Sequence, residues 1–107
     1  MRRFGMVIGL REDQAERYRE LHRGEGVRDL LSDANIRNFS IYLQRLPDGK
    51  LYEFACYEYV GDDFEGDMAR LDANPRNVEW LKLCDPMQIP LPGHTGWAEM
   101  ELIYFNP

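Results

Sequence analysis

The sequence predicts an α+β fold with the ferredoxin-like order β-α-β-β-α-β, in which helices cover one face of an antiparallel sheet. Apolar residues alternate with their neighbours over 2–10, 36–44 and 51–60, which is the period of a half-buried strand. Residues 12–23 instead carry apolar side chains at helical spacing. An Asp-Gly pair at 48–49 lies between the second and third strands, and this pair is a strong hairpin signal.

The first helix is expected at residues 12–23 and begins with two acidic residues at the positive end of the helix dipole. Gly24 and Gly26 then interrupt the helical spacing, because glycine both ends helices and permits bends. Apolar residues resume that spacing at Val27. We therefore expect this segment to be bent or broken between its two parts.

The second helical region, between the third strand and residue 86, has two start signals. An aspartate at 62 or 63 can cap its first part, and Asn74 followed by proline can start its second part. Residues 85–96 contain three prolines and two glycines, which favours a long surface loop, and loops of this kind are often functional. A final strand is expected at residues 97–105.

Composition indicates a single domain that covers residues 1–107. The chain is 44% hydrophobic, which is enough for one core. Its formal net charge of −6 and its scattered basic residues argue against a nucleic-acid or anionic-membrane partner. No stretch is long enough to span a bilayer. The apolar start, Phe4–Leu10, contains two glycines and runs into charged residues, so we expect a strand rather than an export signal.

The two cysteines, Cys56 and Cys84, fit neither a zinc-binding nor a CxxC spacing. Buried, reduced thiols in a cytoplasmic protein are the expected state, while a disulfide between them is left open. The two histidines are His22 and His94, and no third ligand stands at a spacing typical of a metal site. We therefore expect no bound metal, and we expect His94 to be exposed in the proline-rich loop.

The predicted strands carry apolar residues on both faces. In the last strand, for example, Trp97 and Phe105 share one face while Ala98 and Tyr104 share the other. Helices on one side of a sheet leave the second apolar face uncovered, and a twin subunit is the simplest cover. We therefore expect a homodimer with its two sheets face to face. The alternative is that the loop at 85–96 covers that face within one chain.

Tyr18 and His22 are the most informative pair in the chain. Residues four apart lie on one face of a helix, so the phenol and the imidazole are expected side by side against the core. Histidine donates and accepts protons near neutral pH, which suits acid–base chemistry. The alternative is a core histidine that is satisfied by a backbone carbonyl, with Tyr18 as packing.

The Asn-Phe-Ser-Ile-Tyr-Leu stretch at 38–43, which follows Tyr18-x-x-x-His22, resembles the L-rhamnose mutarotase family. The likeness extends over almost the whole chain, including the hairpin and the closing strand. It implies a small dimeric ferredoxin-like enzyme that interconverts the α and β anomers of a deoxy-sugar without cofactor or metal. It also implies that His22 is the proton donor and that Tyr18 and Trp80 contact the monosaccharide.

Three departures from the family pattern fall in the expected sugar pocket. The family usually carries Ile-Trp-Pro shortly after the histidine, whereas residues 23–27 here contain neither tryptophan nor proline. Phe39 stands where a tyrosine commonly contacts the sugar, and Leu81 stands where a second tryptophan follows Trp80. Because a site that pairs a substrate hydroxyl discriminates strongly, we expect L-rhamnose to be a weaker substrate than another 6-deoxyhexose, with L-fucose the leading candidate.

Anomer exchange needs one proton delivered to the ring oxygen and another removed from the anomeric hydroxyl, so a second proton-transfer group is required. Tyr18, a carboxylate such as Glu99 or Glu101, or water could serve, and the sequence does not choose among them. Glu53 and Glu58 are expected at a rim or a dimer interface. No hydride or electron moves and no GxGxxG motif is present, so no cofactor is expected.

Two other functions fit the same fold. One is cofactor-free monooxygenation of an aromatic substrate, which the apolar Phe39 and Leu81 favour. The other is a non-catalytic dimer that binds a small molecule. Fold alone does not separate these functions from a sugar mutarotase.

Overall fold

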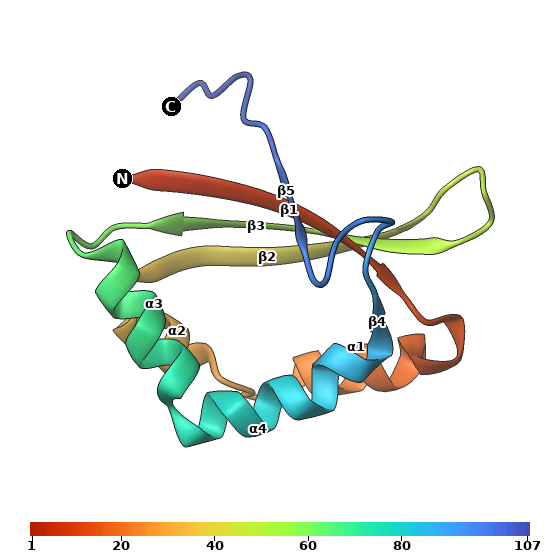
Figure 1. The fold of residues 1–107 in the computed structure, drawn as a ribbon, viewed down its shortest axis with the longest axis horizontal. Coiled ribbons are helices and arrows are strands. Elements are labelled where there is room, and N and C mark those ends of the chain that lie inside the picture. The colour runs from red at the N-terminus through yellow and green to blue at the C-terminus, as the bar shows by residue number, and fades with distance from the viewer.

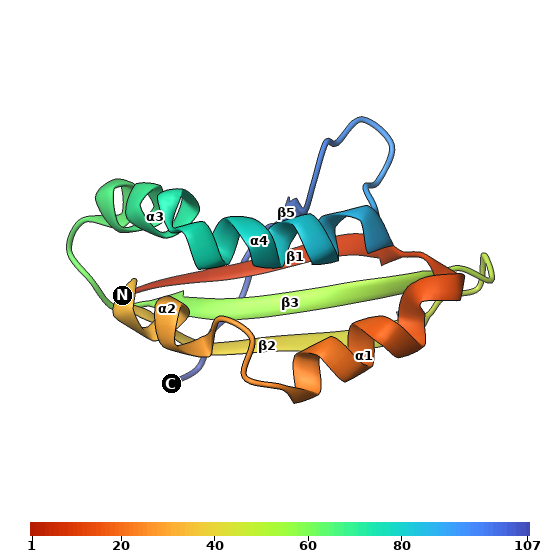
Figure 2. The ribbon, with the colours of Figure 1, turned by 90° about the horizontal axis from the view of Figure 1, so that it is seen from below.

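The computed structural model describes residues 1–107 as an antiparallel sheet that carries its helices on one face (Figure 1 and Figure 2). The strands are β1 (Arg2–Leu10), β2 (Ile36–Arg45), β3 (Leu51–Tyr59), β4 (Gln88–Ile89) and β5 (Ala98–Met100). The α-helices are α1 (Ala15–Arg23), α2 (Arg28–Asp33), α3 (Phe64–Ala73) and α4 (Pro75–Cys84). Two short 3-10 helices precede α1 and follow α4, η1 (Glu12–Gln14) and η2 (Asp85–Met87).

The strand order across the sheet is β2-β3-β1-β4, and β5 also pairs with β1. The paired strands are antiparallel, and β1 lies against β3 along its full length, from Arg2 opposite Tyr59 to Leu10 opposite Leu51. The predicted ferredoxin-like fold is confirmed. The other edge of β1 is shared by two short strands, since β4 pairs with its end and β5 with its middle.

The helix signals expected from the sequence are present in the structure. The Asp63 side chain accepts a hydrogen bond from the Gly66 amide and caps α3. The Asn74 side chain accepts one from the Arg76 amide and caps α4, with proline in the first turn. Between α1 and α2 the helix is broken, and Gly26 there adopts a φ of 55°, in the left-handed region that glycine tolerates.

The buried face of the sheet lies under the helices. Along β3 the odd-numbered residues Leu51, Glu53, Ala55 and Tyr59 are buried, as the strand period requires. The buried core cluster joins β1, α1, β3, α4 and η2 through Leu10, Ala15, Tyr18, Leu51, Cys84 and Met87. The helix that carries Tyr18 is therefore anchored directly on the strand that carries Glu53.

A β-bulge changes which residues of β2 face the helices. The pairing of β2 with β3 shifts between Arg37 and Ser40, and Asn38 there has a φ of 53°. Because one extra residue reverses the alternation, Ile36 before the bulge and Ile41 after it reach the same side. The bulge is thus part of the wall of the cavity described below.

The final strand is shorter than expected. Residues 97–105 were predicted as one strand, but β5 ends at Met100, and residues 101–107 have no regular secondary structure and are exposed. The alternating pattern identifies side chains that suit a strand, but a strand also needs a partner for its backbone groups, and β1 supplies one only opposite β5. In Figure 1 this C-terminal tail leaves the sheet on the side away from the helices.

Two further expectations need correction. Residues 85–96 were expected to be a loop throughout, but they begin with η2 and β4. Cys56 was expected to be buried, but it lies on the face of β3 opposite the helices and is exposed, because its even position alternates with the buried residues. Cys84 is buried as expected, and both thiols are free.

The sheet face opposite the helices, called the open face below, carries apolar and aromatic residues. Tyr42 of β2 is 66% exposed, and Phe54 and Cys56 of β3 share its face. In Figure 2 the loop after β4 lies beyond the β1 edge and does not extend over β2 and β3, which only the tail after β5 crosses. The structure therefore does not use this loop as the cover for the open face.

Candidate functional site

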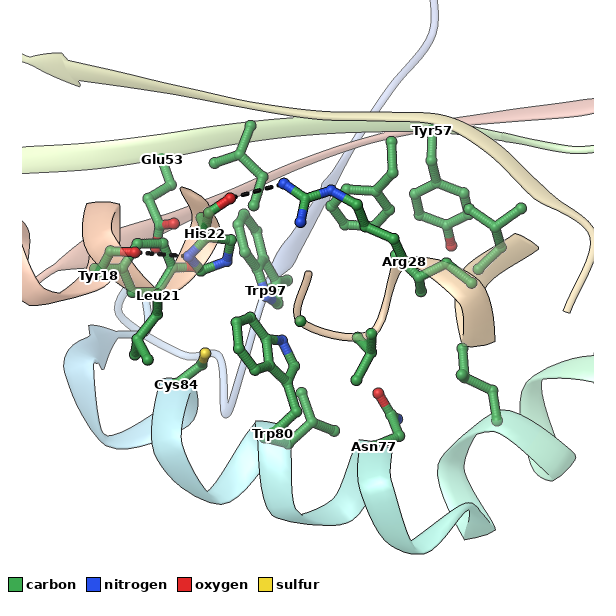
Figure 3. A pocket seen from close by; sticks show the side chains of 18 of the residues that line it. Tyr18, Leu21, His22, Arg28, Glu53, Tyr57, Asn77, Trp80, Cys84 and Trp97 are labelled. Atoms are coloured by element: carbon green, nitrogen blue, oxygen red, sulfur yellow. Dashed lines mark hydrogen bonds between the residues drawn. The ribbon is translucent and has the colours of Figure 1, made fainter. Parts of the chain in front are cut away.

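A pocket of about 840 Å³ lies between the helices and the sheet (Figure 3). Its size falls in the range of small-molecule sites. Side chains from β1, β2, β3 and all four α-helices line it, together with Gln88 of β4 and Trp97 just before β5. The three site residues predicted from the sequence, Tyr18, His22 and Trp80, all lie in this pocket.

The His22 ring is held between two aromatic side chains. The Tyr18 ring, one helical turn earlier on α1, stacks on it with centroids 4.2 Å apart and planes 29° apart. The Trp80 ring of α4 meets it edge-on, with centroids 5.2 Å apart. The i, i+4 spacing supplies the first contact, and the packing of α4 on the sheet supplies the second.

A backbone hydrogen bond fixes the orientation of His22. Its Nδ1 lies 2.7 Å from the Tyr18 carbonyl oxygen, and a carbonyl only accepts, so Nδ1 donates. The other nitrogen, Nε2, points away from that carbonyl and has no protein partner (Figure 3). The backbone-satisfied histidine considered above is therefore present. The same bond leaves Nε2 free for a bound molecule.

Glu53 occupies the floor of the pocket and was not expected there. It is 1% exposed, it points from β3 toward Tyr18 (Figure 3), and neither carboxylate oxygen has a hydrogen-bond partner. Loss of hydration raises the pKa of this carboxyl to about 7, although Tyr18 and Gln88 lie near enough to oppose the rise. The rim or dimer-interface position expected for Glu53 is wrong, because residue 53 alternates with Tyr52 and Phe54 and so faces the helices.

The Tyr18 hydroxyl lies between two polar groups. It accepts a hydrogen bond from Gln88 Nε2 at 3.2 Å. Burial, and after it the nearby charge of Glu53, raises the pKa of the phenol well above its usual value, so the phenol is neutral. With its oxygen already accepting from Gln88, the hydroxyl keeps its own proton to donate.

Two other lining residues define the chemical character of the pocket. Burial raises the pKa of the Cys84 thiol to about 11, which leaves it protonated and unreactive. Trp97 adds a second indole from a separate segment of the chain. Sequence reasoning placed Trp97 in the last strand and missed it as a site residue, although a tryptophan directly after a Pro/Gly-rich loop was a usable signal.

The departures from the family pattern line the same pocket. The Phe39 ring stacks on Tyr57 with centroids 5.4 Å apart and planes 6° apart, and Leu81 lies on α4 beside Trp80. In place of the missing Trp-Pro, the Gly26 backbone lies against Trp80, where an added Cβ would come within 3.2 Å of the indole. Arg28 donates to the carbonyl oxygens of His22 and Gly24 and so caps the end of α1.

Comparison with known proteins places this site in a family. The family model described as L-rhamnose mutarotase matches residues 3–105. The chain belongs to the L-rhamnose mutarotase family. No curated protein sequence matches it at a significant level.

Solved structures show that this mutarotase-family chain shares its fold with proteins of different function. An L-rhamnose mutarotase from Formosa agariphila superposes with a TM-score of 0.73 at 18% identity, over 100% of both chains. A putative antibiotic biosynthesis monooxygenase from Nitrosomonas europaea superposes with a TM-score of 0.55 at 10% identity, over 95% of this chain and 91% of the other. At these identities the likeness establishes the fold.

No group of three or more His, Cys, Asp or Glu side chains is arranged to hold a metal ion. No helix has the length and apolar character needed to cross a membrane. His94 lies on the surface, away from His22, as the sequence predicted.

Proposed function

We propose that this protein is an L-rhamnose mutarotase whose substrates extend to related 6-deoxyhexoses such as L-fucose, and that His22 is its proton donor. The observation that carries the proposal is the His22 ring, held between Tyr18 and Trp80 with Nε2 free toward a pocket of monosaccharide scale. Membership of the mutarotase family supports the reaction.

Ring opening follows from these groups. A proton from His22 Nε2 reaches the ring oxygen while the anomeric hydroxyl gives its proton to a second proton-transfer group. The bond between the anomeric carbon and the ring oxygen then breaks, and a carbonyl forms at that carbon. Rotation presents the other carbonyl face, and closure returns both protons. Acid–base catalysis of this kind contributes about 10²–10⁴-fold.

The aromatic side chains suit a sugar ligand. The faces of Trp80 and Trp97 can cover the C–H side of a pyranose ring, and each indole N–H can donate to a hydroxyl. Tyr18 and Gln88 add polar contacts deeper in the pocket. Phe39 and Leu81 offer no such groups, which supports a substrate preference different from that of relatives with tyrosine and tryptophan there.

The experiment is saturation-transfer NMR on an anomeric mixture of unlabelled sugar. The protein should transfer saturation between the α and β signals of L-rhamnose and L-fucose faster than buffer alone, with D-glucose as the comparison sugar. No acceleration with any 6-deoxyhexose would contradict the proposal.

A second candidate is supported by the fold shared with a putative antibiotic biosynthesis monooxygenase and by the apolar Phe39 and Leu81. Cofactor-free oxidation of a bound aromatic molecule would consume dioxygen. Oxygen uptake with electron-rich phenols, together with absent anomer exchange, would favour this second function over the first.

We also propose that the protein is a cytoplasmic homodimer. The exposed aromatic residues of the open face and of the C-terminal tail support the dimer. The two free thiols, one of them exposed, support a reducing compartment.

A further inference from the structure

Anomer exchange also needs a group that exchanges a proton with the anomeric hydroxyl, and the proposed function does not name that group. Two candidates considered from the sequence, Glu99 and Glu101, are exposed and do not line the pocket. Among the carboxylates that line it, Glu25, Asp72 and Asp85 are exposed and only Glu53 is buried. The remaining candidate is therefore Glu53, on the floor of the pocket.

The environment of Glu53 does not fit a purely structural role. A buried carboxylate without hydrogen bonds destabilises a fold, and leucine or glutamine would fill the same space at lower cost. A group retained against this cost in a pocket is a candidate for function. Its titratable neighbours are Tyr18 from α1 and Cys84 from α4, both neutral, with the uncharged Gln88 from β4.

The polar contacts define a direction for the proton. Gln88 donates to the Tyr18 oxygen, so the phenol has its own proton to give. The Tyr18 hydroxyl lies close to Glu53, and both Glu53 carboxylate oxygens are free to accept that proton. Tyr18 also stacks directly on His22, so the proposed proton donor and the phenol next to Glu53 lie on adjacent turns of α1.

We propose that Tyr18 and Glu53 together form the second proton-transfer unit of the mutarotase reaction, with Tyr18 in contact with the sugar and Glu53 acting through it as a positioning residue. During ring opening the anomeric hydroxyl passes its proton to the Tyr18 oxygen, and Tyr18 passes its own proton to Glu53. His22 protonates the ring oxygen as the C–O bond breaks. Protonated His22 and ionised Glu53 become neutral together, and closure reverses each transfer.

The acidity of Glu53 supports this assignment. With a pKa of about 7, its carboxyl both accepts and releases a proton near neutral pH. The inference rests on the proposed mutarotase function, because it assigns the partner of His22 in that reaction.

The test uses Glu53→Gln and Tyr18→Phe, with Glu99→Gln as a matched carboxylate outside the pocket. Each of the first two should slow anomer exchange at least about tenfold, and the double variant should fall no further than the slower single variant, because the two groups act as one unit. Because the reaction needs ionised Glu53, the acidic limb of the wild-type pH profile should reflect a group with a pKa of about 7, and Glu53→Gln should lose that limb. Glu99→Gln should match wild type in both rate and pH profile.

A structural readout separates chemistry from misfolding. Carbon-13 NMR of glutamate-labelled wild-type protein should show one carboxyl that titrates near neutral pH, absent from Glu53→Gln and shifted in Tyr18→Phe. Wild-type rate and pH profile in Glu53→Gln would overturn the inference and leave the mutarotase function intact. A wild-type protein that exchanges no sugar would overturn both, and that result is visible before any variant is made.

Discussion

The hydrogen bond from His22 Nδ1 to the Tyr18 carbonyl leaves Nε2 as the one ring nitrogen available for chemistry. Replacing His22 with glutamine keeps a polar group near Nε2 but removes proton transfer. We expect His22→Gln and His22→Ala to slow anomer exchange at least about tenfold, the lower part of the general-acid range. Saturation-transfer NMR measures the rate, and circular dichroism reports whether the variants are folded.

A matched variant separates orientation from proton transfer. His22→Asn places an amide near Nδ1, where it can still donate to the Tyr18 carbonyl, and offers nothing at Nε2. It should therefore fold like the wild type and be as slow as His22→Gln. Unchanged exchange in a folded His22→Ala protein would remove His22 from the mechanism.

Glu53 also links pH to stability. Its pKa is about 7 in the folded protein against 4.5 for an unperturbed glutamate, so the folded state binds the proton more tightly. This group therefore lowers the free energy of unfolding as pH rises from about 4.5 through about 7, by at most about 3 kcal/mol. Glu53→Gln should be more stable than wild type at pH 8, with the difference shrinking below pH 4.5. Urea unfolding at pH 4 and pH 8 measures it, and a difference that does not vary with pH would contradict the pKa assignment.

Single residues differ in how readily the sequence reveals them. Tyr18, His22 and Trp80 could be predicted as site residues from helical spacing and the family pattern. In the structure their three rings lie in contact. Glu53 was missed because a charged side chain suggests a surface position, although the strand period already placed it on the buried face. Trp97 was missed because it was assigned only to the last strand, although its position directly after a Pro/Gly-rich loop was a usable signal.

At the scale of elements, the bulge in β2 brings Phe39 into the pocket that Leu81 of α4 also lines. A lost hydroxyl contact costs about 0.5–1.5 kcal/mol when the sugar group remains hydrated, and more when it is buried. We expect wild type to exchange L-fucose anomers faster than those of L-rhamnose. The double variant Phe39→Tyr, Leu81→Trp should shift the rate ratio toward L-rhamnose.

The control for this specificity prediction is Tyr42→Phe, which changes a hydroxyl on the other face of β2, outside the pocket. It should leave the ratio of the two rates unchanged. If wild type already prefers L-rhamnose and the double variant does not move the ratio, Phe39 and Leu81 do not set specificity.

Elements with local signals were predicted, and elements that depend on a partner were not. The first strand, the hairpin and the starts of α3 and α4 follow from alternation, an Asp-Gly turn and two capping side chains. The end of β5 does not, since residues 101–105 continue the alternating pattern without a neighbouring strand. The β2 bulge was also missed, because a register shift is a property of two strands rather than one.

For the whole molecule, one sheet face carries no helices, and only the C-terminal tail crosses it (Figure 1 and Figure 2). The helices bury the other face, the loop after β4 stays beside the β1 edge, and the tail from Glu101 to Pro107 is exposed and apolar in its middle (Figure 1 and Figure 2). Ile103 is 86% exposed, while the ring of Phe105 lies under the guanidinium of Arg3, 3.4 Å from the ring centroid. Such a surface on a small domain is typical of an interface.

We therefore expect sedimentation at micromolar concentration to give twice the chain mass. Ile103→Glu or Tyr42→Glu should shift the mass toward the monomer, because each places an unpaired charge in a contact that excludes water. Ala69→Glu, which adds the same charge to the exposed side of α3, should leave the dimer intact. A compact monomer at every concentration would contradict the face-to-face dimer. Dissociation by Ala69→Glu would instead place the interface on the helical side of the molecule.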